Sequence, residues 1–350
     1  MPVSPEPRAA IRQLAAYEPV DRQGINLSDN ANLFDTNPVI QEALAEVDPD
    51  EVRRYPSGYS DELRATIADV HDHPAEGVVT ANGSSDLIDL LVRTFTDPKG
   101  KVAYHPPSFS MIPLWTTCNA CDPEPVPLTD EFGLDGDAFV AADADLGVVC
   151  RPNNPTGNAF PIDVVEDVAD RFEGLLVVDE AYVNFTDEPD AMHLRDRDDV
   201  AILRSLSKDA GLAGTRFGYA LMPPELAQEV RKVRGPFRVP RITEEIARRA
   251  LEDPGHVDRV AKIVKEERAR VSRRLKEMGL SPFPTETNFV LVETPWPSSR
   301  VQGALADRGV LVRDFGSETL EACFRATIGP PEVNDALLDA VESMLDDGGP

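Results

Sequence analysis

The stretch SLSKDAGLAGTRFGY, residues 205–219, decides how the rest of this chain is interpreted. An apolar run, VAILR (200–204), precedes it, and a second one, FGYALM (217–222), overlaps its end. Between the two runs stand Lys208 and Arg216, on either side of a glycine-rich turn. The pattern fits a solvated loop between two strands, but it also fits a lysine that attacks the aldehyde of a covalently held cofactor. The remaining sequence distinguishes these two interpretations.

Short apolar runs alternate with helical patterns around this stretch. Strands are expected at residues 101–106, 146–152, 175–182, 200–207 and 217–222. Several of these runs are apolar without a break, which indicates strands buried on both faces of a mainly parallel sheet. The segment PIDVVEDVADRF (161–172) has the spacing of an amphipathic helix that crosses over between two of them. We therefore predict an α/β fold with a large domain built on this sheet.

The pattern of the chain changes after residue 240. The segments 242–253 and 256–279 are helical patterns with charges spaced three and four residues apart, and short strands and a closing helix follow them. This order indicates a smaller α+β domain. We predict a large domain over residues 35–240, and a small domain that combines residues 241–350 with an N-terminal arm, residues 1–34.

Length and charge limit the possible functions. The 350 residues suffice for a large core and two domains. With 62 acidic and 35 basic residues the net charge is −27, which repels phosphate backbones and argues against nucleic-acid binding. Such an acidic surface suits a high-salt cytoplasm, where counter-ions screen the repulsion. Because no apolar run approaches the roughly 18 residues of a membrane span and no secretory signal is present, we expect a cytoplasmic protein without membrane contact.

Cys118 and Cys121 form a CxxC pattern. This pattern can be half of a zinc site or a redox pair, but no second CxxC and no histidine pair at ligand spacing completes a metal site. The pair lies at the end of a helical pattern that runs into a proline-rich turn, DPEPVPL (122–128), which is not a thioredoxin-like context. We expect no metal, and we interpret both cysteines as reduced packing residues.

Polar side chains stand where several of the predicted strands end. The turn RPNNPTG (151–157) follows one strand, and Asp179 and Tyr182 lie at the end of the next. Lys208 follows a third strand, and Arg216 precedes another. Because the ligands of a parallel α/β sheet collect at the carboxyl ends of its strands, we expect these side chains to converge on one crevice.

A pyridoxal phosphate enzyme needs such a set of side chains. A lysine amine bonds to the cofactor aldehyde and later moves the proton at the substrate α-carbon, while a carboxylate keeps the pyridine nitrogen protonated. The phenolic oxygen needs a hydrogen-bond partner, the phosphate needs a helix N-terminus with hydroxyls and an arginine, and an aromatic side chain holds the ring. In this order the sequence offers Lys208; Asp179; Tyr182 with Asn154; Gly83, Ser84, Ser85, Ser205, Ser207 and Arg216; and Phe109.

Each of these residues alone has a structural alternative. A lone carboxylate such as Asp179 more often caps a helix or pairs with a cation, and an aromatic residue such as Phe109 more often lies in the core. A lysine in a glycine-rich loop is usually solvated. The joint occurrence of all these residues, most of them beside strand ends, favours the cofactor site.

The chain resembles the fold-type I pyridoxal phosphate aminotransferases of class I and II from about residue 25 to 345. The motifs that carry the resemblance are RYPSG (54–58), NGSSDLIDLL (82–91), PPSFSM (106–111), PNNPTG (152–157), VVDEAYVNF (177–185), SLSKDAGLAGTRFGY (205–219), VRGPFRV (233–239), TNFVLV (287–292), GVLVRDF (309–315) and FRATIG (324–329). The first of these and the last two make it most similar to the histidinol-phosphate branch. The resemblance implies a large domain with a sheet of the seven-stranded type flanked by helices, and a homodimer with shared active sites.

The resemblance also implies roles for individual residues. Lys208 is implied as the Schiff-base lysine, with Asp179 at the pyridine nitrogen, Tyr182 and Asn154 at the ring oxygen, and Phe109 where the family usually has a stacking tyrosine. Gly83, Ser84, Ser85, Ser205, Ser207 and Arg216 correspond to the phosphate site, to which Tyr55 is added from the neighbouring subunit. The resemblance implies that Arg325 and Arg313 bind the anionic end of the substrate. Two further candidates for substrate binding are Asn32 and Arg238, which lie in segments that are near the substrate pocket in the family; Arg238 would be an unusual third cation there.

Two segments depart from the family pattern, and three activities stay open. The family's Asn-Glu-Asn-Pro is Asn-Ala-Asn-Leu at residues 30–33, and its Pro-Phe-Asn-Val is Pro-Phe-Arg-Val at residues 236–239. Transamination of histidinol phosphate with 2-oxoglutarate is the leading hypothesis. An aromatic amino-acid aminotransferase and a threonine-phosphate decarboxylase use the same cofactor and are the alternatives, and a binding protein that has lost turnover belongs to a different class.

Overall fold

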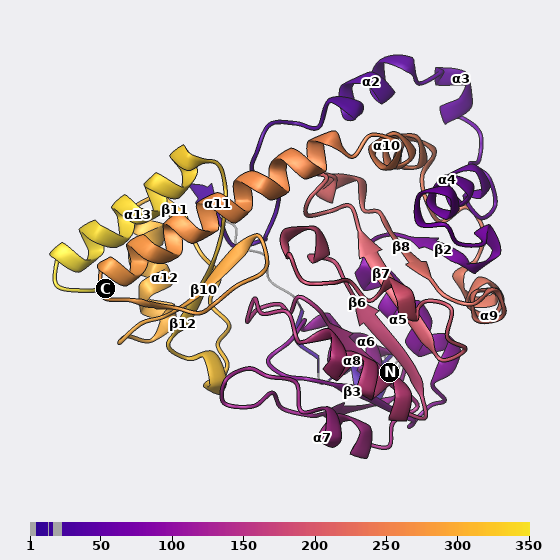
Figure 1. Ribbon diagram of the computed structural model, residues 1–350, viewed down its shortest axis with the longest axis horizontal. Helices are drawn as coiled ribbons and strands as arrows, with labels where there is room; N and C mark the ends of the chain where they lie inside the picture. The colour runs from indigo at the N-terminus through magenta and orange to yellow at the C-terminus, as the bar shows by residue number, and fades with distance from the viewer. Residues whose placement is uncertain (1–4, 13, 17–22) are drawn as a thin grey trace.

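The computed structural model describes residues 5–12, 14–16 and 23–350. Figure 1 shows two lobes, a large one coloured indigo to salmon and a small one coloured orange to yellow. A seven-stranded sheet with helices on both faces forms the large lobe, and two smaller sheets with their own helices form the other. No helix in the described part of the chain has both the length and the apolar character needed to cross a bilayer.

The strands of the large sheet lie in the order β2-β8-β7-β6-β5-β3-β4. Their bounds are Val78–Ala81 for β2, Lys101–Tyr104 for β3, Asp122–Pro125 for β4, Leu146–Cys150 for β5, Leu175–Asp179 for β6, Val200–Ser205 for β7 and Gly218–Leu221 for β8. Strands β3 to β7 are parallel, whereas β8 is antiparallel to both of its neighbours. The sheet is therefore mixed with a parallel centre, which confirms the predicted α/β class.

All five predicted strands are present, and each is two or three residues shorter than predicted. The residues lost at the carboxyl ends leave the sheet ladder and enter the loops that form the site. Strand β4 corrects the prediction of a proline-rich turn at residues 122–128. Among the described strands it pairs only with β3, at the edge of the sheet, where a proline can replace a residue whose N–H has no partner strand.

Helices cover both faces of the large sheet. One face carries α2 (Pro38–Glu46), α4 (Asp61–His71), α7 (Gly136–Ala141), α8 (Ile162–Arg171) and α10 (Arg241–Glu252), and the other carries α5 (Ser84–Phe95), α6 (Met111–Cys118) and α9 (Pro224–Arg234). A short helix, α3 (Pro49–Val52), follows α2. Successive residues of β6 alternate between the two apolar layers, since Leu176 packs into the first layer and Val177 into the second. Burial on both faces explains the unbroken apolar runs.

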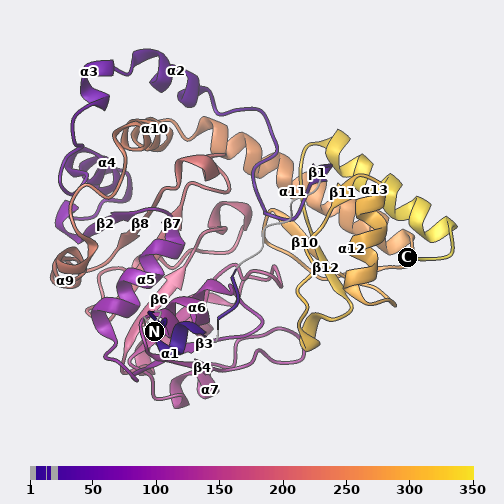
Figure 2. The same ribbon diagram turned by 180° about the vertical axis from the view of Figure 1, so that it is seen from behind.

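The small lobe is an α+β unit. Its antiparallel sheet has the order β12-β10-β9, and a parallel pair joins β1 to β11. The bounds are Ile25–Asn26 for β1, Ser281–Pro282 for β9, Phe289–Glu293 for β10, Val310–Leu311 for β11, Cys323–Thr327 for β12, Gly255–Glu277 for α11, Ser298–Asp307 for α12 and Pro331–Asp346 for α13. Figure 2 shows β1 beside β11, so this part of the N-terminal arm is attached to the small lobe.

Two segments lie across the predicted domain boundaries. Ile246 and Ala247 of α10 belong to the core that covers the seven-stranded sheet, whereas Val260 of α11 belongs to the core of the small lobe. The side chains that pack into one core therefore give way to those that pack into the other along α11. At the other end of the chain, Arg8, just before α1 (Ala9–Arg12), donates a hydrogen bond to the backbone carbonyl of Cys118 in α6. The division at residues 34 and 240 stays a prediction.

Candidate active site

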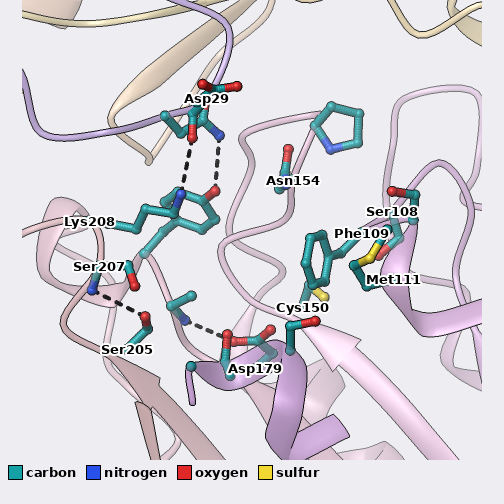
Figure 3. A pocket seen from close by; sticks show the side chains of 18 of the residues that line it. Asp29, Ser108, Phe109, Met111, Cys150, Asn154, Asp179, Ser205, Ser207 and Lys208 are labelled. Atoms are coloured by element: carbon teal, nitrogen blue, oxygen red, sulfur yellow. Dashed lines mark hydrogen bonds between the residues drawn. The ribbon is translucent and has the colours of Figure 1, made fainter. Parts of the chain in front are cut away.

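A cavity of about 560 Å³ lies where β5, β6 and β7 end, and residues of both lobes line it. Its walls also include residues from the N-terminal arm and from the small lobe. The residues predicted from the sequence that line it are Gly83, Ser84, Ser85, Phe109, Asn154, Asp179, Tyr182, Ser205, Ser207, Lys208, Arg216, Arg313 and Arg325. Figure 3 shows Lys208 and Asp179 in the same cavity, with Phe109 across from Lys208.

Lys208 lies in the turn after β7 and is half-buried. Its Nζ donates a hydrogen bond to the backbone carbonyl of Asp29, at 3.2 Å (Figure 3). Burial, followed by the positive charge of Arg325, lowers the pKa of Lys208 to about 8. The amine of Lys208 therefore loses its proton more readily than that of an exposed lysine.

Asp179 is the last residue of β6 and is 5% exposed. Burial raises its pKa to about 6, against the effect of a hydrogen bond from the backbone N–H of Ala181 at 3.1 Å and the charge of Lys208. The neighbouring residue, Glu180, points away from the cavity and pairs with Arg204 at 2.9 Å. Asp179 is therefore a buried carboxylate, and a cation in the cavity would stabilise its charged form.

Tyr182 brings the arm into the site through Asn30, a residue that the sequence reasoning did not select for this role. The Nδ2 of Asn30 donates a hydrogen bond to the Tyr182 hydroxyl at 2.9 Å. Burial raises the pKa of Tyr182 to about 12, so its hydroxyl keeps its proton near neutral pH and can donate it. The Oδ1 of Asn30 is buried and has no hydrogen-bond partner in the described part of the chain. The sequence signal that could have identified Asn30 is its position as the first asparagine of the altered motif at residues 30–33.

The turn between β2 and α5 forms a cradle for an anion. Gly83 is the N-cap of α5, has a φ of 89° and offers no side chain to cap the helix. A Cβ at Gly83 would lie 3.0 Å from the Nη2 of Arg216, and one at Gly218 would lie 2.7 Å from the backbone nitrogen of Ser84. Glycine therefore lets the arginine and strand β8 approach the start of α5 closely. The uncapped amides and the guanidinium together fit a phosphate group.

Hydroxyl groups complete this cradle. Ser205 ends β7, and its Oγ accepts a hydrogen bond from the backbone N–H of Ser207 at 3.2 Å. The Oγ of Ser85 accepts a hydrogen bond from the indole nitrogen of Trp115 in α6, at 2.9 Å. Both interactions fix the serines in place and leave the hydroxyl hydrogens able to donate to an anion.

Phe109 lies on the opposite wall of the cavity from Lys208 (Figure 3). The same wall contains Cys150 and Met111. Burial raises the pKa of the Cys150 thiol far above its usual range. The Oγ of Ser108 is buried there without a hydrogen-bond partner among the described residues. An aromatic ring, two sulfur atoms and an unused hydroxyl form a mainly apolar wall that suits a planar ring with one polar substituent.

Arg325 and Arg313 come from the small lobe. They form an isolated antiparallel bridge, in which each backbone N–H donates to the carbonyl of the other at 2.9 Å. Arg325 is 6% exposed, and its guanidinium donates to the side chain of Asn154 and to the backbone carbonyl of Ser28. It also lies 5.1 Å from the ring of Phe289. Two cations that stand side by side at the cavity can bind an anionic ligand group.

Three predicted residues do not line the cavity. Asn32 donates a hydrogen bond to the carbonyl of Asp209 at 2.9 Å, and Arg238 pairs with Asp86. Tyr55 is 82% exposed and stacks on Phe237, with ring centroids 4.8 Å apart. Within this chain these three side chains contact protein groups outside the cavity. For Tyr55, exposure at the surface is compatible with the expected contact to a second subunit.

The comparisons with known proteins agree with this geometry. A solved structure of histidinol-phosphate aminotransferase from Sinorhizobium meliloti, in complex with pyridoxal-5'-phosphate, is 25% identical and has a TM-score of 0.87. The alignment covers 96% of this chain and 97% of that one. An aspartate aminotransferase of Thermus thermophilus, 19% identical with a TM-score of 0.84, shares the fold. The fold is therefore that of the pyridoxal phosphate-dependent transferases of fold type I.

Sequence similarity identifies the family within this fold. The family model described as "Aminotransferase class I and II" matches residues 22–341. A histidinol-phosphate aminotransferase from Oleidesulfovibrio alaskensis is 34% identical, over 97% of this chain and 96% of the relative. A second relative, histidinol-phosphate aminotransferase 1 from Nostoc sp., is 29% identical over 97% and 98% of the two chains. The chain belongs to the class I and II aminotransferases.

We predict that Asp179→Asn stabilises the cofactor-free protein near pH 7. The raised pKa means that the folded state binds a proton more tightly at Asp179 than the unfolded state does, so its contribution to stability is lost as the pH rises from about 4 through about 6. Asparagine removes this cost, and the free energy of unfolding should rise by up to about 3 kcal/mol. Urea unfolding of the wild type and the variant measures this gain in the free energy of unfolding, which should be smaller near pH 5. A variant that is less stable than the wild type near pH 7 contradicts this account.

Proposed function

We propose that this chain is a pyridoxal phosphate-dependent aminotransferase that transfers an amino group between histidinol phosphate and 2-oxoglutarate. The observation that carries the proposal is the joint position of Lys208 and Asp179 in one cavity whose end carries the uncapped start of α5. The names of the relatives from Oleidesulfovibrio alaskensis and Nostoc sp. support the choice of donor.

The residues of the cavity fit pyridoxal phosphate. Asp179 would hold the pyridine nitrogen, Tyr182 and Asn154 the phenolic oxygen, and Phe109 one face of the ring. The amides, hydroxyls and guanidinium around the start of α5, from Gly83, Ser84, Ser85, Ser205, Ser207 and Arg216, would hold the phosphate. When bound, the cofactor supplies an electron sink that stabilises negative charge at the substrate α-carbon.

Lys208 would act as nucleophile and as general base through the same atom. Because its pKa is lowered to about 8, its Nζ is neutral in part of the molecules near neutral pH. A neutral amine can attack an aldehyde and can take up a proton from the substrate. The hydrogen bond to the Asp29 carbonyl holds Nζ at the cavity before a ligand binds.

Asp179 and Tyr182 would set the charge around the ring. A carboxylate that is buried at the end of β6 is stabilised by a proton held on the opposite nitrogen, because two opposite charges then share one desolvated site. Tyr182 stays protonated near neutral pH, since its pKa is raised to about 12, and it can donate to an oxygen of the ring. Asn30 would orient that hydroxyl through its own hydrogen bond.

Arg325 and Arg313 would bind the anionic ends of the substrates. A guanidinium makes two parallel hydrogen bonds to a carboxylate or to a phosphate, so one pair can serve a dicarboxylate and a phosphorylated amine in turn. The hydrogen bond from Arg325 to Asn154 connects this pair to the loop that follows β5. Phe109 and Phe315 also line the cavity and favour a flat ring, which is the basis of the alternative aromatic donor.

We further propose a cytoplasmic enzyme that is adapted to high salt. The net charge of −27 is the supporting observation, because counter-ions screen the mutual repulsion of so many carboxylates.

Lys208→Ala is expected to abolish transamination, because nucleophile and proton carrier are lost together. The variant should fold and should retain cofactor through its phosphate, without the visible absorbance of a lysine-bound cofactor. Steady-state rates and absorbance spectra check both statements. Lys265→Ala, at a half-buried lysine outside the cavity, is the control. Turnover of any amino donor by Lys208→Ala at the wild-type rate excludes the proposed role.

Histidinol phosphate is expected to be the preferred donor over phenylalanine, tyrosine and threonine phosphate. Arg313→Gln should then lower kcat/KM for histidinol phosphate by roughly ten- to a hundredfold, because one charge-assisted contact contributes about 1.5–3 kcal/mol. Arg300→Gln, at an exposed arginine of α12 outside the cavity, is the matched control. A wild-type enzyme that uses aromatic amino acids and ignores histidinol phosphate supports the alternative donor, and release of carbon dioxide from threonine phosphate supports the decarboxylase.

We propose that two copies form a homodimer in which Tyr55 reaches the phosphate of the neighbouring cofactor. Tyr55 is 82% exposed and adjoins exposed Phe237, so a large aromatic surface is available to a second chain. A symmetric dimer exposes the same surface twice and can bury both copies at once.

Mixing two impaired variants is expected to restore activity if Tyr55 acts across the interface. A heterodimer of Tyr55→Phe and Lys208→Ala chains contains one site with both native residues in that case. If Tyr55 acts within its own chain, both sites carry a defect. Activity of purified heterodimers, compared with each parent alone, measures the difference. The absence of recovery in heterodimers of confirmed composition contradicts the shared site.

A further inference from the structure

Asp86 places a negative charge beside the proposed phosphate cradle. It is the acidic residue in the first turn of α5, three positions after the N-cap Gly83. Its Oδ2 accepts a hydrogen bond from the backbone N–H of Asn82 at 3.0 Å, so the carboxylate reaches back over the turn between β2 and α5. The charge is thus held within the first helical turn, whose pitch is about 5.4 Å.

This carboxylate has opposite effects on the helix and on the ligand. An acidic side chain in the first turn stabilises a helix, because it faces the positive end of the helix dipole. The same end of α5 would also hold a cofactor phosphate, which carries about two negative charges near neutral pH. Without compensation, the carboxylate and the phosphate repel each other across a partly buried site.

Arg238 contacts this carboxylate at two points. Its Nε donates to Oδ2 of Asp86 at 2.7 Å, and its Nη2 donates to Oδ1. The side chains are 28% and 15% exposed, so solvent screens the pair only in part. Burial raises the pKa of Asp86, but the hydrogen bonds from Arg238 and Asn82 and the charge of Arg238 outweigh it, and the pKa lies below its usual value. The pair is therefore fully ionised near neutral pH.

The loop that carries Arg238 is held in place independently of any ligand. Nη1 of Arg238 donates to the backbone carbonyl of Arg234 at 3.3 Å, and the N–H of Phe237 donates to the carbonyl of Gly58 at 2.8 Å. Arg234 is itself buried and donates to the carbonyl and hydroxyl of Thr80 in β2. The guanidinium thus lies behind the cradle, and it does not line the cavity.

We propose that Arg238 is a positioning residue that neutralises Asp86, and that the start of α5 can hold a doubly charged phosphate because of this ion pair. The inference rests on the cofactor of the proposed function. It replaces the role in substrate binding that was expected for Arg238 from the sequence, because the guanidinium contacts the carboxylate of Asp86 outside the cavity.

Cofactor binding to the full-length protein tests the proposal. Affinities for pyridoxal phosphate and for pyridoxal, which lacks the phosphate, are measured for the wild type, Arg238→Gln, Asp86→Asn and the double variant. Arg238→Gln should weaken pyridoxal phosphate binding by about tenfold and leave pyridoxal binding unchanged. Asp86→Asn in the double variant should restore the affinity, because the amide oxygen can still accept from Asn82 while the charge is gone. Higher salt should reduce the loss.

Arg270→Gln is the matched control. Arg270 pairs with Glu267 in α11, with side chains 30% and 12% exposed, and this pair lies outside the cavity. The Arg270→Gln variant should leave the affinities for pyridoxal phosphate and pyridoxal unchanged. An unchanged affinity in Arg238→Gln, an equal loss for pyridoxal, or a double variant as weak as Arg238→Gln overturns the inference while the cofactor assignment stands. A wild type that does not prefer pyridoxal phosphate to pyridoxal overturns the inference and the proposed function together.

Discussion

The site depends on two groups of opposite charge beside the ends of neighbouring parallel strands, Asp179, which is buried, and Lys208, which is half-buried. The register of β6 with β7 aligns Asp179 with Leu203, so Lys208 follows five residues beyond that point in the turn. Burial opposes both charges, raising the pKa of Asp179 and lowering that of Lys208, while each charge partly favours the other. A ligand that bridges both groups lowers this cost.

One arginine of the small lobe contacts both the large lobe and the N-terminal arm at the cavity. Arg325 extends from β12 of the small lobe and donates to the side chain of Asn154 in the large lobe and to the carbonyl of Ser28 in the arm. These contacts join three distant parts of the sequence around the cavity. The parallel pair of β1 with β11 holds the arm where Asn30 reaches Tyr182. The cavity therefore exists only when the arm and both lobes are assembled, and no single segment could form it alone.

The sequence predicted the part of the site that follows local rules. Lys208, Asp179 and Asn154 stand at or after the ends of apolar strands, and the switch-point rule for parallel sheets brings such positions together. Asn30 was not selected for its bond to Tyr182, because that contact depends on the pairing of β1 with β11, which is long-range and involves only two residues in each strand. Arg238 was assigned to the pocket by resemblance, but the sequence contains no local signal that it pairs with Asp86, 152 residues away.

The fold was predictable to a similar degree and for similar reasons. Unbroken apolar runs identified the central strands, since burial on both faces leaves little freedom in composition. Strand β4 was not predicted, because prolines are tolerated only in an edge strand and the position of a strand at the edge depends on the tertiary structure. The amphipathic pattern of α10 predicted a helix and could not say which core it would cover, because an apolar stripe fits any apolar surface of matching shape.

The cavity and the surface of this protein carry opposite charges. The chain as a whole has a net charge of −27, whereas the described residues around the cavity include Lys208, Arg216, Arg313 and Arg325 against Asp29 and Asp179. Surface repulsion of an anionic substrate acts over the Debye length, about 10 Å at 0.1 M salt and about 3 Å at 1 M. Contacts inside the cavity are much less screened. Salt therefore removes the long-range repulsion while the binding contacts persist, so an acidic surface and a cationic cavity are compatible in one enzyme, most of all at high ionic strength.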